Sequence, residues 1–319
     1  MAKSLIGIDI NSIEVVMAHS DGTVIHEKMP ANLIESGKIV SPESLSDFLK
    51  KVKKENGLSG SDCAIVLPES STYFRTVDSP VISESQLKLN LPFEFRDFVG
   101  VNSINYNYDY VVENIEKDSE GNPTSMHLFA AAAQKDVVDE YAKILKKAGL
   151  KLKVALPNEM CIINLMRQKA DPEKEYCLIG VGYDYTRVYI LKGHTLKASK
   201  DIDIANKDID AVIARNENTS EYLAASERDN NHNDVLNSSY LTEVYESIGL
   251  EVMKTINFYK YENSDSNLDT IHFFSMGSKN VALCDTICRY VDFKKGDIKD
   301  ILPSQFEDER GLMNIGLIL

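Results

Sequence analysis

The first residues that could do chemistry stand where an apolar run meets a polar turn. Asp9 closes the run from Leu5 to Ile8, and Asn11-Ser12 follow it. A carboxylate here could hold Mg²⁺ through water, or it could cap its own turn without any ligand. Gly180-Val181-Gly182 follows a second apolar run. A lone GxG is more often a tight turn or bulge than a phosphate cradle, so both interpretations stay open for the pair Gly180 and Gly182.

Other residue types with catalytic or metal-binding potential lack a suitable spacing. The five cysteines form no CxxC pair, and Cys284 and Cys288 share an apolar helical stripe that predicts burial. The six histidines are scattered over separate predicted elements. Ser70-Ser71 and Cys63 show no nucleophile elbow or adjacent base, which disfavours a hydrolase. We therefore assign no catalytic residue.

Two similar hairpins must position Asp9 and the GxG. The pattern of residues 5–18 predicts a buried strand, a polar turn and a returning strand, and residues 178–191 repeat this pattern. Aligned without a gap, Asp9 falls on Gly182, and in the other register it falls on Gly180. Either alignment puts a glycine opposite Asp9, and Asp184 lies at another turn position. The sequence predicts a weak internal duplication whose second copy lacks the carboxylate.

The length of 319 residues and the changes in residue pattern along the chain predict two lobes and an inserted subdomain. The stretch from Asp171 to Glu175 is the best candidate for a linker between two lobes. Residues 215–237 are rich in Asn, Asp, Ser and Glu, which predicts a mobile surface excursion. We expect a first part of lobe I at 1–61, an inserted α+β subdomain at 62–150, a return to lobe I at 151–172, lobe II at 173–300, and a C-terminal return segment at 301–319.

The inserted segment carries the clearest local signals. Ser83 and Gln86 have the spacing of a capping box at the start of a helix. A hairpin is expected from alternating strands on either side of a polar turn at 117–123. One face of its first strand carries Tyr106, Tyr108 and Tyr110. Their phenolic groups could grip a peptide, or the face could pack against the helix of the subdomain.

Composition narrows the range of partners. The formal net charge is -14, which disfavours nucleic acid and anionic lipid surfaces as general partners. The start of the chain reads directly as a strand rather than a signal peptide, and no apolar run reaches the roughly 20 residues that span a bilayer. We expect a cytoplasmic protein without direct membrane insertion.

In order and spacing, several motifs together resemble the PilM family of the actin-like (ASKHA, FtsA-related) superfamily. The resemblance covers nearly the whole chain and rests on these stretches: LIGIDINSIEVV, VLPESSTYFRTVDSP, AAAAQKDVVDEYAKILKKAGLKLKVALPNEMCIINLM, CLIGVGYDYTRVYIL and IHFFSMGSKNVALCDTI. It implies the α/β fold of an actin-like ATPase, with two ribonuclease-H-like lobes and a small inserted subdomain.

The resemblance also implies where a nucleotide would lie. In this superfamily phosphates lie between two opposed hairpin turns of small residues, and carboxylates hold Mg²⁺ through water. The matching positions are Asp9, Asn11 and Ser12 in the first turn, Gly180 and Gly182 in the second, and Gly277 and Ser278 in the adenosine turn. Asn11 replaces a glycine, the second carboxylate is missing, and Met276 replaces another glycine. ATP with Mg²⁺, held by Asp9 through water, and no cofactor at all both stay open, and efficient hydrolysis is not expected.

The functional expectation follows from the same resemblance. A PilM-like protein binds the short cytoplasmic N-terminal segment of a PilN-like membrane protein and other components of a type IV pilus or related secretion machine, at the inner face of the membrane. An FtsA-like nucleotide-dependent switch or polymerising protein is the first alternative. A small-molecule kinase of the same superfamily is the second, and it would need the catalytic carboxylate and glycine-rich turn that are altered here.

Overall fold

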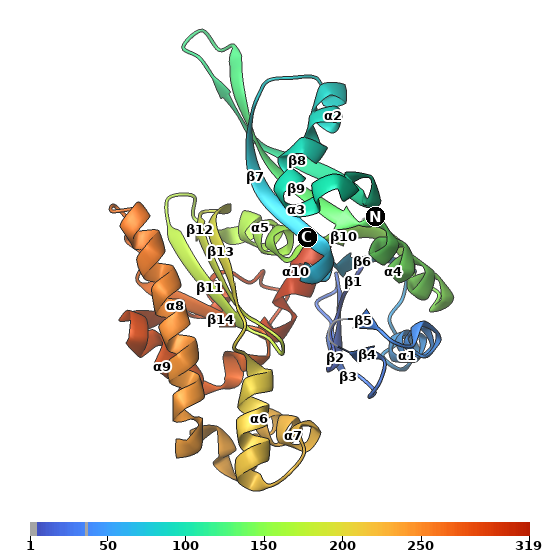
Figure 1. Ribbon diagram of the computed structural model, residues 1–319, viewed down its shortest axis with the longest axis vertical. Coiled ribbons are helices and arrows are strands. Elements are labelled where there is room, and N and C mark those ends of the chain that lie inside the picture. Colours follow the sequence, from blue (N-terminus) through green and yellow to red (C-terminus); the bar gives the residue numbers. More distant parts are fainter. Residues whose placement is uncertain (1–4, 36–37) are drawn as a thin grey trace.

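The two lobes are built on five-stranded sheets with the same strand order. In the computed structural model, which describes residues 5–35 and 38–319, the orders are β10-β6-β1-β2-β3 and β13-β12-β11-β14-β15. Counted along the chain, the first three strands of each sheet form an antiparallel meander, and the last two pair in parallel beside the first strand. The predicted pair of ribonuclease-H-like lobes is therefore confirmed (Figure 1).

The strands and helices have the following bounds. The first sheet consists of β1 (Ile6–Ile10), β2 (Glu14–His19), β3 (Val24–Lys28), β6 (Asp62–Val66) and β10 (Lys151–Leu156), with the small pair β4 (Ile34–Glu35) and β5 (Lys38–Ile39) nearby. The second consists of β11 (Glu175–Val181), β12 (Thr186–Lys192), β13 (Thr195–Ile202), β14 (Thr270–Phe274) and β15 (Lys294–Lys295). The helices of the two lobes are α1 (Pro42–Glu55), α4 (Lys135–Lys147), α5 (Asn158–Lys169), α6 (Asn206–Glu217), α7 (Glu221–Asp229), α8 (Thr242–Glu262), α9 (Val281–Val291) and α10 (Leu312–Ile318).

The first sheet is covered on both faces. The apolar stripe of α1, with Leu45 and Leu49, packs with α4 against Ile6 and Ile8 of β1. On the other face, α5 and α10 bury their side chains against the same sheet. Gly7 allows this contact, because a Cβ there would lie 2.5 Å from the carbonyl oxygen of Asn314 in α10.

The alternation of β11 sends its side chains into two different cores. Cys177 and Ile179 belong to the core of lobe II beneath α8 and α9. Leu178 points the other way, into a cluster that also contains Cys161 of α5 and Ile315 of α10. Because this second cluster contains residues of both sheets, the lobes share one hydrophobic core, and Figure 1 shows α5 and α10 between them.

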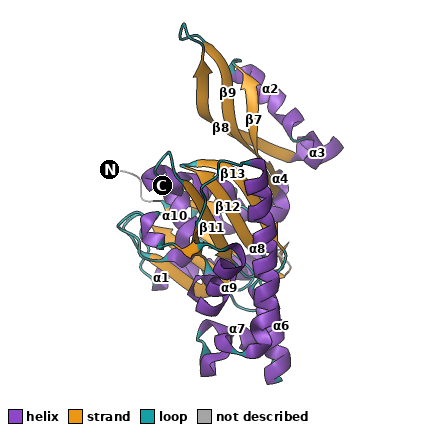
Figure 2. Ribbon diagram, turned by 90° about the vertical axis from the view of Figure 1, so that its left-hand side faces the viewer, coloured by secondary structure: helices purple, strands orange, loops and turns teal. Residues whose placement is uncertain are grey.

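A third sheet projects from the body as a separate subdomain (Figure 2). Its order is β7-β9-β8, formed by β7 (Thr72–Pro80), β8 (Tyr106–Lys117) and β9 (Pro123–Gln134), and it is covered by α2 (Glu84–Glu94) and α3 (Arg96–Val99). The expected capping box is present, since the Ser83 hydroxyl accepts from the Gln86 N–H and the Gln86 side chain accepts from the Ser83 N–H. Of the segment predicted as inserted, 62–150, this sheet and its helices occupy 72–134, whereas β6 and α4 belong to lobe I.

The prediction that residues 215–237 form a surface excursion outside the packed fold is wrong. These residues complete α6 and form α7, whose Ala224 and Ala225 are buried in lobe II. Arg228 is also buried, and it pairs with the fully buried Asp210 of α6. Polar composition is a poor guide here because the segment buries the charge of Arg228 together with that of its partner Asp210.

Candidate functional site

The turns of the two duplicated hairpins face the same cleft between the lobes. This cleft has a volume of about 440 Å³. Lobe I contributes Asp9, Asn11 and Ser12 to its lining, together with a loop that includes Glu69. Lobe II contributes residues 183–185 and the side chain of Arg187. The predicted residues of the first hairpin therefore lie in one cleft with the second turn.

The first turn is closed by the side chain of Asn11. Its Oδ1 accepts hydrogen bonds from the backbone N–H groups of Ile13, at 3.0 Å, and Glu14, at 2.9 Å. The N–H of Asn11 itself donates to the carbonyl of Glu14 at 3.1 Å. Phosphate binding at such a turn depends on free backbone N–H groups. Asn11 therefore occupies donors that a glycine in its place would leave available.

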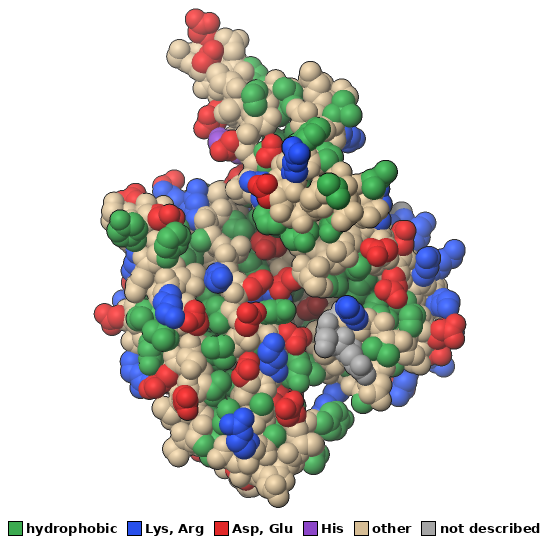
Figure 3. Space-filling model, in the orientation of Figure 1, with side chains coloured by type: hydrophobic (Ala, Val, Ile, Leu, Met, Phe, Trp, Pro, Cys, Tyr) green, Lys and Arg blue, Asp and Glu red, His purple; other side chains and the backbone are tan. Residues whose placement is uncertain are grey.

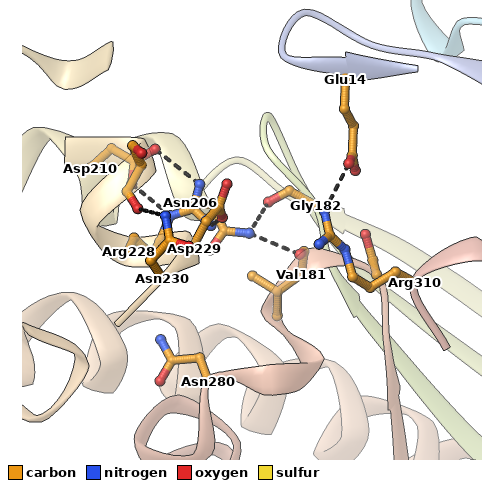
Figure 4. Close-up of polar contacts among 12 residues, drawn as sticks. Glu14, Val181, Gly182, Asn206, Asp210, Arg228, Asp229, Asn230, Asn280 and Arg310 are labelled. Carbon is orange, nitrogen blue, oxygen red and sulfur yellow. Dashed lines mark hydrogen bonds and ion pairs between the residues drawn. The ribbon is translucent and has the colours of Figure 1, made fainter. Parts of the chain in front are cut away.

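The second turn is held from within lobe II. The N–H of Gly182 donates to the carbonyl of Tyr185 at 3.0 Å. The side-chain Nδ2 of buried Asn206, at the start of α6, donates to the carbonyls of Val181, at 3.0 Å, and Gly182, at 2.7 Å (Figure 4). These bonds fix the position at which the turn projects into the cleft.

Strand pairing decides which glycine corresponds to Asp9. Asp9 lies opposite Val16 in the first hairpin, and Gly180 lies opposite Arg187 in the second, so Asp9 and Gly180 are equivalent. A Cβ at Gly180 would lie 2.4 Å from the ring of Phe274 on β14. Gly180 therefore makes room for an aromatic ring within the sheet, and neither it nor Gly182 is among the residues that line the cleft.

The carboxyl group of Asp9 is electrostatically perturbed. Burial raises its pKa to about 6, the Arg187 guanidinium opposes that rise, and Glu14 and Glu69 add to it. Asp184, on the opposite turn, also has a raised pKa because of burial, which Lys207 and Arg187 counteract. At neutral pH the cleft thus presents carboxylates beside two basic side chains.

The predicted adenosine turn lies elsewhere in lobe II. Gly277 is buried, and a Cβ there would lie 2.5 Å from the Cβ of Val181. The Ser278 hydroxyl donates to the carbonyl of Ser275 at 2.8 Å. Neither Gly277 nor Ser278 lines the cleft that contains Asp9, so the structure does not bring the three predicted groups together in one cavity.

A residue pair that the sequence did not indicate crosses the cleft. Arg187 of β12 donates through Nε to Oε1 of Glu69, which follows β6. The Asn158 side chain donates to the same oxygen at 2.9 Å, and Asp201 lies 3.6 Å from the Arg187 Nε. Nothing in the local pattern marks Glu69, since its partner lies 118 positions away.

The residues of the cleft do not fit a Mg²⁺–triphosphate in this arrangement. Asn11 takes the turn donors, and Gly180 supplies no second carboxylate. Within residues 5–35 and 38–319, no cluster of three or more His, Cys, Asp or Glu side chains is arranged to hold a metal ion.

The predicted tyrosine face points into the inserted subdomain. Tyr106, Tyr108 and Tyr110 are half-buried against its core. The Tyr108 ring centroid lies 5.8 Å from that of Phe95, and the Tyr108 hydroxyl donates to the carbonyl of Ser103 at 3.0 Å. The geometry favours the packing interpretation for Tyr108 and Tyr110, whereas Tyr106 also lines a groove.

This groove lies where the inserted subdomain meets lobe I. We call it the junction groove; its volume is about 500 Å³, and its lining consists of Asn102, Asn105, Tyr106, Gln134, Lys135 and Asp136. Large apolar side chains are exposed beside it, including Val101 at 95% and Ile104 at 79%. The space-filling view shows hydrophobic side chains gathered over this subdomain (Figure 3).

Comparison with known proteins agrees with this architecture. The family model described as type IV pilus assembly protein PilM matches residues 7–294. The chain belongs to the type IV pilus assembly protein PilM family. No curated protein matches the sequence.

Solved structures with low identity to this PilM-family chain share its fold. A structure titled "PilM-PilN type IV pilus biogenesis complex" superposes with a TM-score of 0.81 at 16% identity, covering 98% of this chain and 97% of that chain. The ethanolamine utilization protein EutJ from Carboxydothermus hydrogenoformans gives 0.61 at 12% identity, over 100% and 90%. MreB5 of Spiroplasma citri bound to AMPPNP gives 0.57 at 10% identity, over 99% and 95%. The fold is therefore actin-like.

Among the described residues, none of the helices combines the length and the apolar character that a membrane span needs.

Proposed function

We propose that this protein is a docking platform of a type IV pilus or related secretion machine. It binds the cytoplasmic N-terminal segment of a PilN-like membrane protein, which recruits it to the inner face of the membrane. The observation that carries this proposal is the junction groove with its exposed apolar border. The likeness to a chain solved in a complex with PilN supports it.

The junction groove suits an extended peptide. β8 is an edge strand of its sheet, and Tyr106 stands at its beginning, in the lining of the groove. An edge strand can pair with an added strand, and nearby pockets then select its side chains. Side-chain amides and Lys135 in the groove can bond to the polar groups of a peptide, while Val101 and Ile104 offer apolar contact.

Direct attachment to the bilayer is disfavoured. The net charge of -14 repels anionic lipid headgroups. Recruitment through a membrane-anchored partner avoids this repulsion, and further machine components would then bind surfaces left free by the first partner.

The test measures peptide binding with single exposed residues changed. A fluorescently labelled peptide with the N-terminal sequence of the PilN-like protein from the same genome is titrated with the protein, and anisotropy gives Kd. We expect Val101→Asp and Ile104→Asp each to weaken binding by about tenfold or more, because a loss of ~1.4 kcal/mol at an interface centre has that effect.

Val281→Asp is the matched control. Val281 is 59% exposed at the start of α9 in lobe II, away from the junction groove. This variant should bind the peptide as the unchanged protein does. A wild-type protein that does not bind the peptide, or a Kd that both groove variants leave unaltered, contradicts the proposal.

A further inference from the structure

Among the described residues, side chains of the two lobes meet in the cleft and again outside its lining. At one point Arg187 of lobe II pairs with Glu69 of lobe I. At the other, the Lys28 ammonium of β3 lies 4.4 Å from the ring centroid of Tyr222, in the first turn of α7. We call these two contacts together the cross-cleft latch.

Contacts within lobe I hold Glu69 in position, independently of Arg187. Its loop is fixed to lobe I by the bond from the Leu67 N–H to the carbonyl of Leu156, at 2.8 Å. Asn158, which is 7% exposed, donates to Glu69 from the N-terminus of α5. The side chains of Glu69 and Arg187 are only 24% and 22% exposed, so water screens their attraction less than it screens a surface pair.

Arg187 is also fixed from its own side. Its guanidinium carbon lies 5.6 Å from the centroid of the Tyr185 ring, and the Lys207 ammonium lies 5.4 Å from the same ring. Tyr185 closes the second turn through its carbonyl. The guanidinium therefore lies beside the second turn, in the cleft that Asn11 and Ser12 also line.

We infer that the Glu69 carboxylate takes the place between the two hairpin turns that a nucleotide phosphate would take in an ATP-binding relative. The anion that draws the lobes together belongs to the polypeptide. Lobe closure then requires no nucleotide, and the shared core around Leu178 acts as the hinge. Lys28 and Tyr222 add a second attachment through their cation–π contact.

The latch is independent of the junction groove, because the two share no residue. The test is therefore made on the purified protein without any peptide. Hydrogen exchange is measured for the segments containing residues 69–71 and 183–187 in the wild type, Glu69→Gln, Arg187→Gln and the double variant. Thermal denaturation of each is recorded with and without millimolar Mg-ATP.

We expect Glu69→Gln to speed exchange at residues 183–187 by about fivefold, the factor that corresponds to ~1 kcal/mol. The double variant should exchange no faster than the quicker single variant, since the pair can be lost only once. The matched control is Glu251→Gln, which breaks the exposed Glu251–Lys254 pair on α8 and should leave the segment unchanged. Mg-ATP should not raise the wild-type melting temperature.

Three results would overturn the inference. The first is a clear rise of the wild-type melting temperature with Mg-ATP. The second is additivity of the two single effects in the double variant, which would mean that the side chains act separately. The third is unchanged exchange at residues 183–187 in Glu69→Gln.

Discussion

Replacing Arg228 by methionine removes the partner of a fully buried carboxylate. In the native protein the Arg228 Nε donates to Asp210 Oδ1 at 2.6 Å, and the Arg228 Nη2 donates to Asp210 Oδ2 at 3.2 Å. Figure 4 shows the two side chains facing each other. They are 4% and 0% exposed. Removing one partner of such a pair costs about 3–5 kcal/mol, because the remaining charge stays buried. We therefore expect Arg228→Met to lose about that much free energy of unfolding.

The loss should depend on pH with a defined sign. Burial raises the pKa of Asp210 in the native protein, and Arg228 opposes the rise. Without Arg228 the folded-state pKa rises further above the unfolded value of about 3.9, so the protonated form is favoured in the fold. Stability then falls as pH rises through the folded-state pKa. The variant should be less stable at about pH 8 than at about pH 5, relative to the wild type.

Urea unfolding followed by circular dichroism measures both effects. The double variant Asp210→Asn/Arg228→Met should recover most of the loss and its pH dependence should disappear, because no charge remains to be buried. Lys254→Met, which breaks an exposed pair with Glu251, is the control and should cost about 0–1 kcal/mol. A loss below ~1 kcal/mol in Arg228→Met, equal at both pH values, would refute the reasoning.

Two further predictions concern Asp9 and the C-terminal helix. Burial raises the Asp9 pKa to about 6 from an unfolded value of about 3.9, so stability is lost as pH rises between these two values. Asp9→Asn should therefore raise the melting temperature most at about pH 8, and by roughly half as much at about pH 5. An equal shift at both pH values would contradict this account. A Cβ at Gly316 would lie 2.1 Å from the carbonyl oxygen of Cys161, so Gly316→Ala should lower the free energy of unfolding by about 1–3 kcal/mol, measured by urea titration. An unchanged midpoint would show that α10 can shift without cost.

Sequence reasoning succeeded where a local pattern carries the physical cause. The apolar run before Asp9 and its repeat before Gly182 are strands with the expected turns, because alternation and turn chemistry act over a few residues. The Ser83 capping box is likewise visible in four letters. The family and its fold followed from the order of such segments.

The candidate site was harder to predict because it depends on distant partners. Asp210 and Arg228 look like surface residues until the fold buries them together, and their segment was therefore misread. Glu69 lies in a loop without a recognisable motif, and its role depends on the ion pair with Arg187 of the other lobe. Gly180 matched a phosphate motif, yet its small size serves the ring of Phe274. Such roles arise from tertiary contacts, which a single sequence does not display.

The contact between β1 and α10 has a consequence for biosynthesis. β1 leaves the ribosome long before α10, on which it packs, and Asn314 of α10 donates to the carbonyls of Gly7 in β1, at 3.4 Å, and Val16 in β2, at 2.8 Å. Until α10 is translated, one face of the first sheet lacks this cover. Its apolar side chains then stay exposed, and chaperones or other nascent chains can bind them. Completion of lobe I is thus a late event, even though its strands are made first.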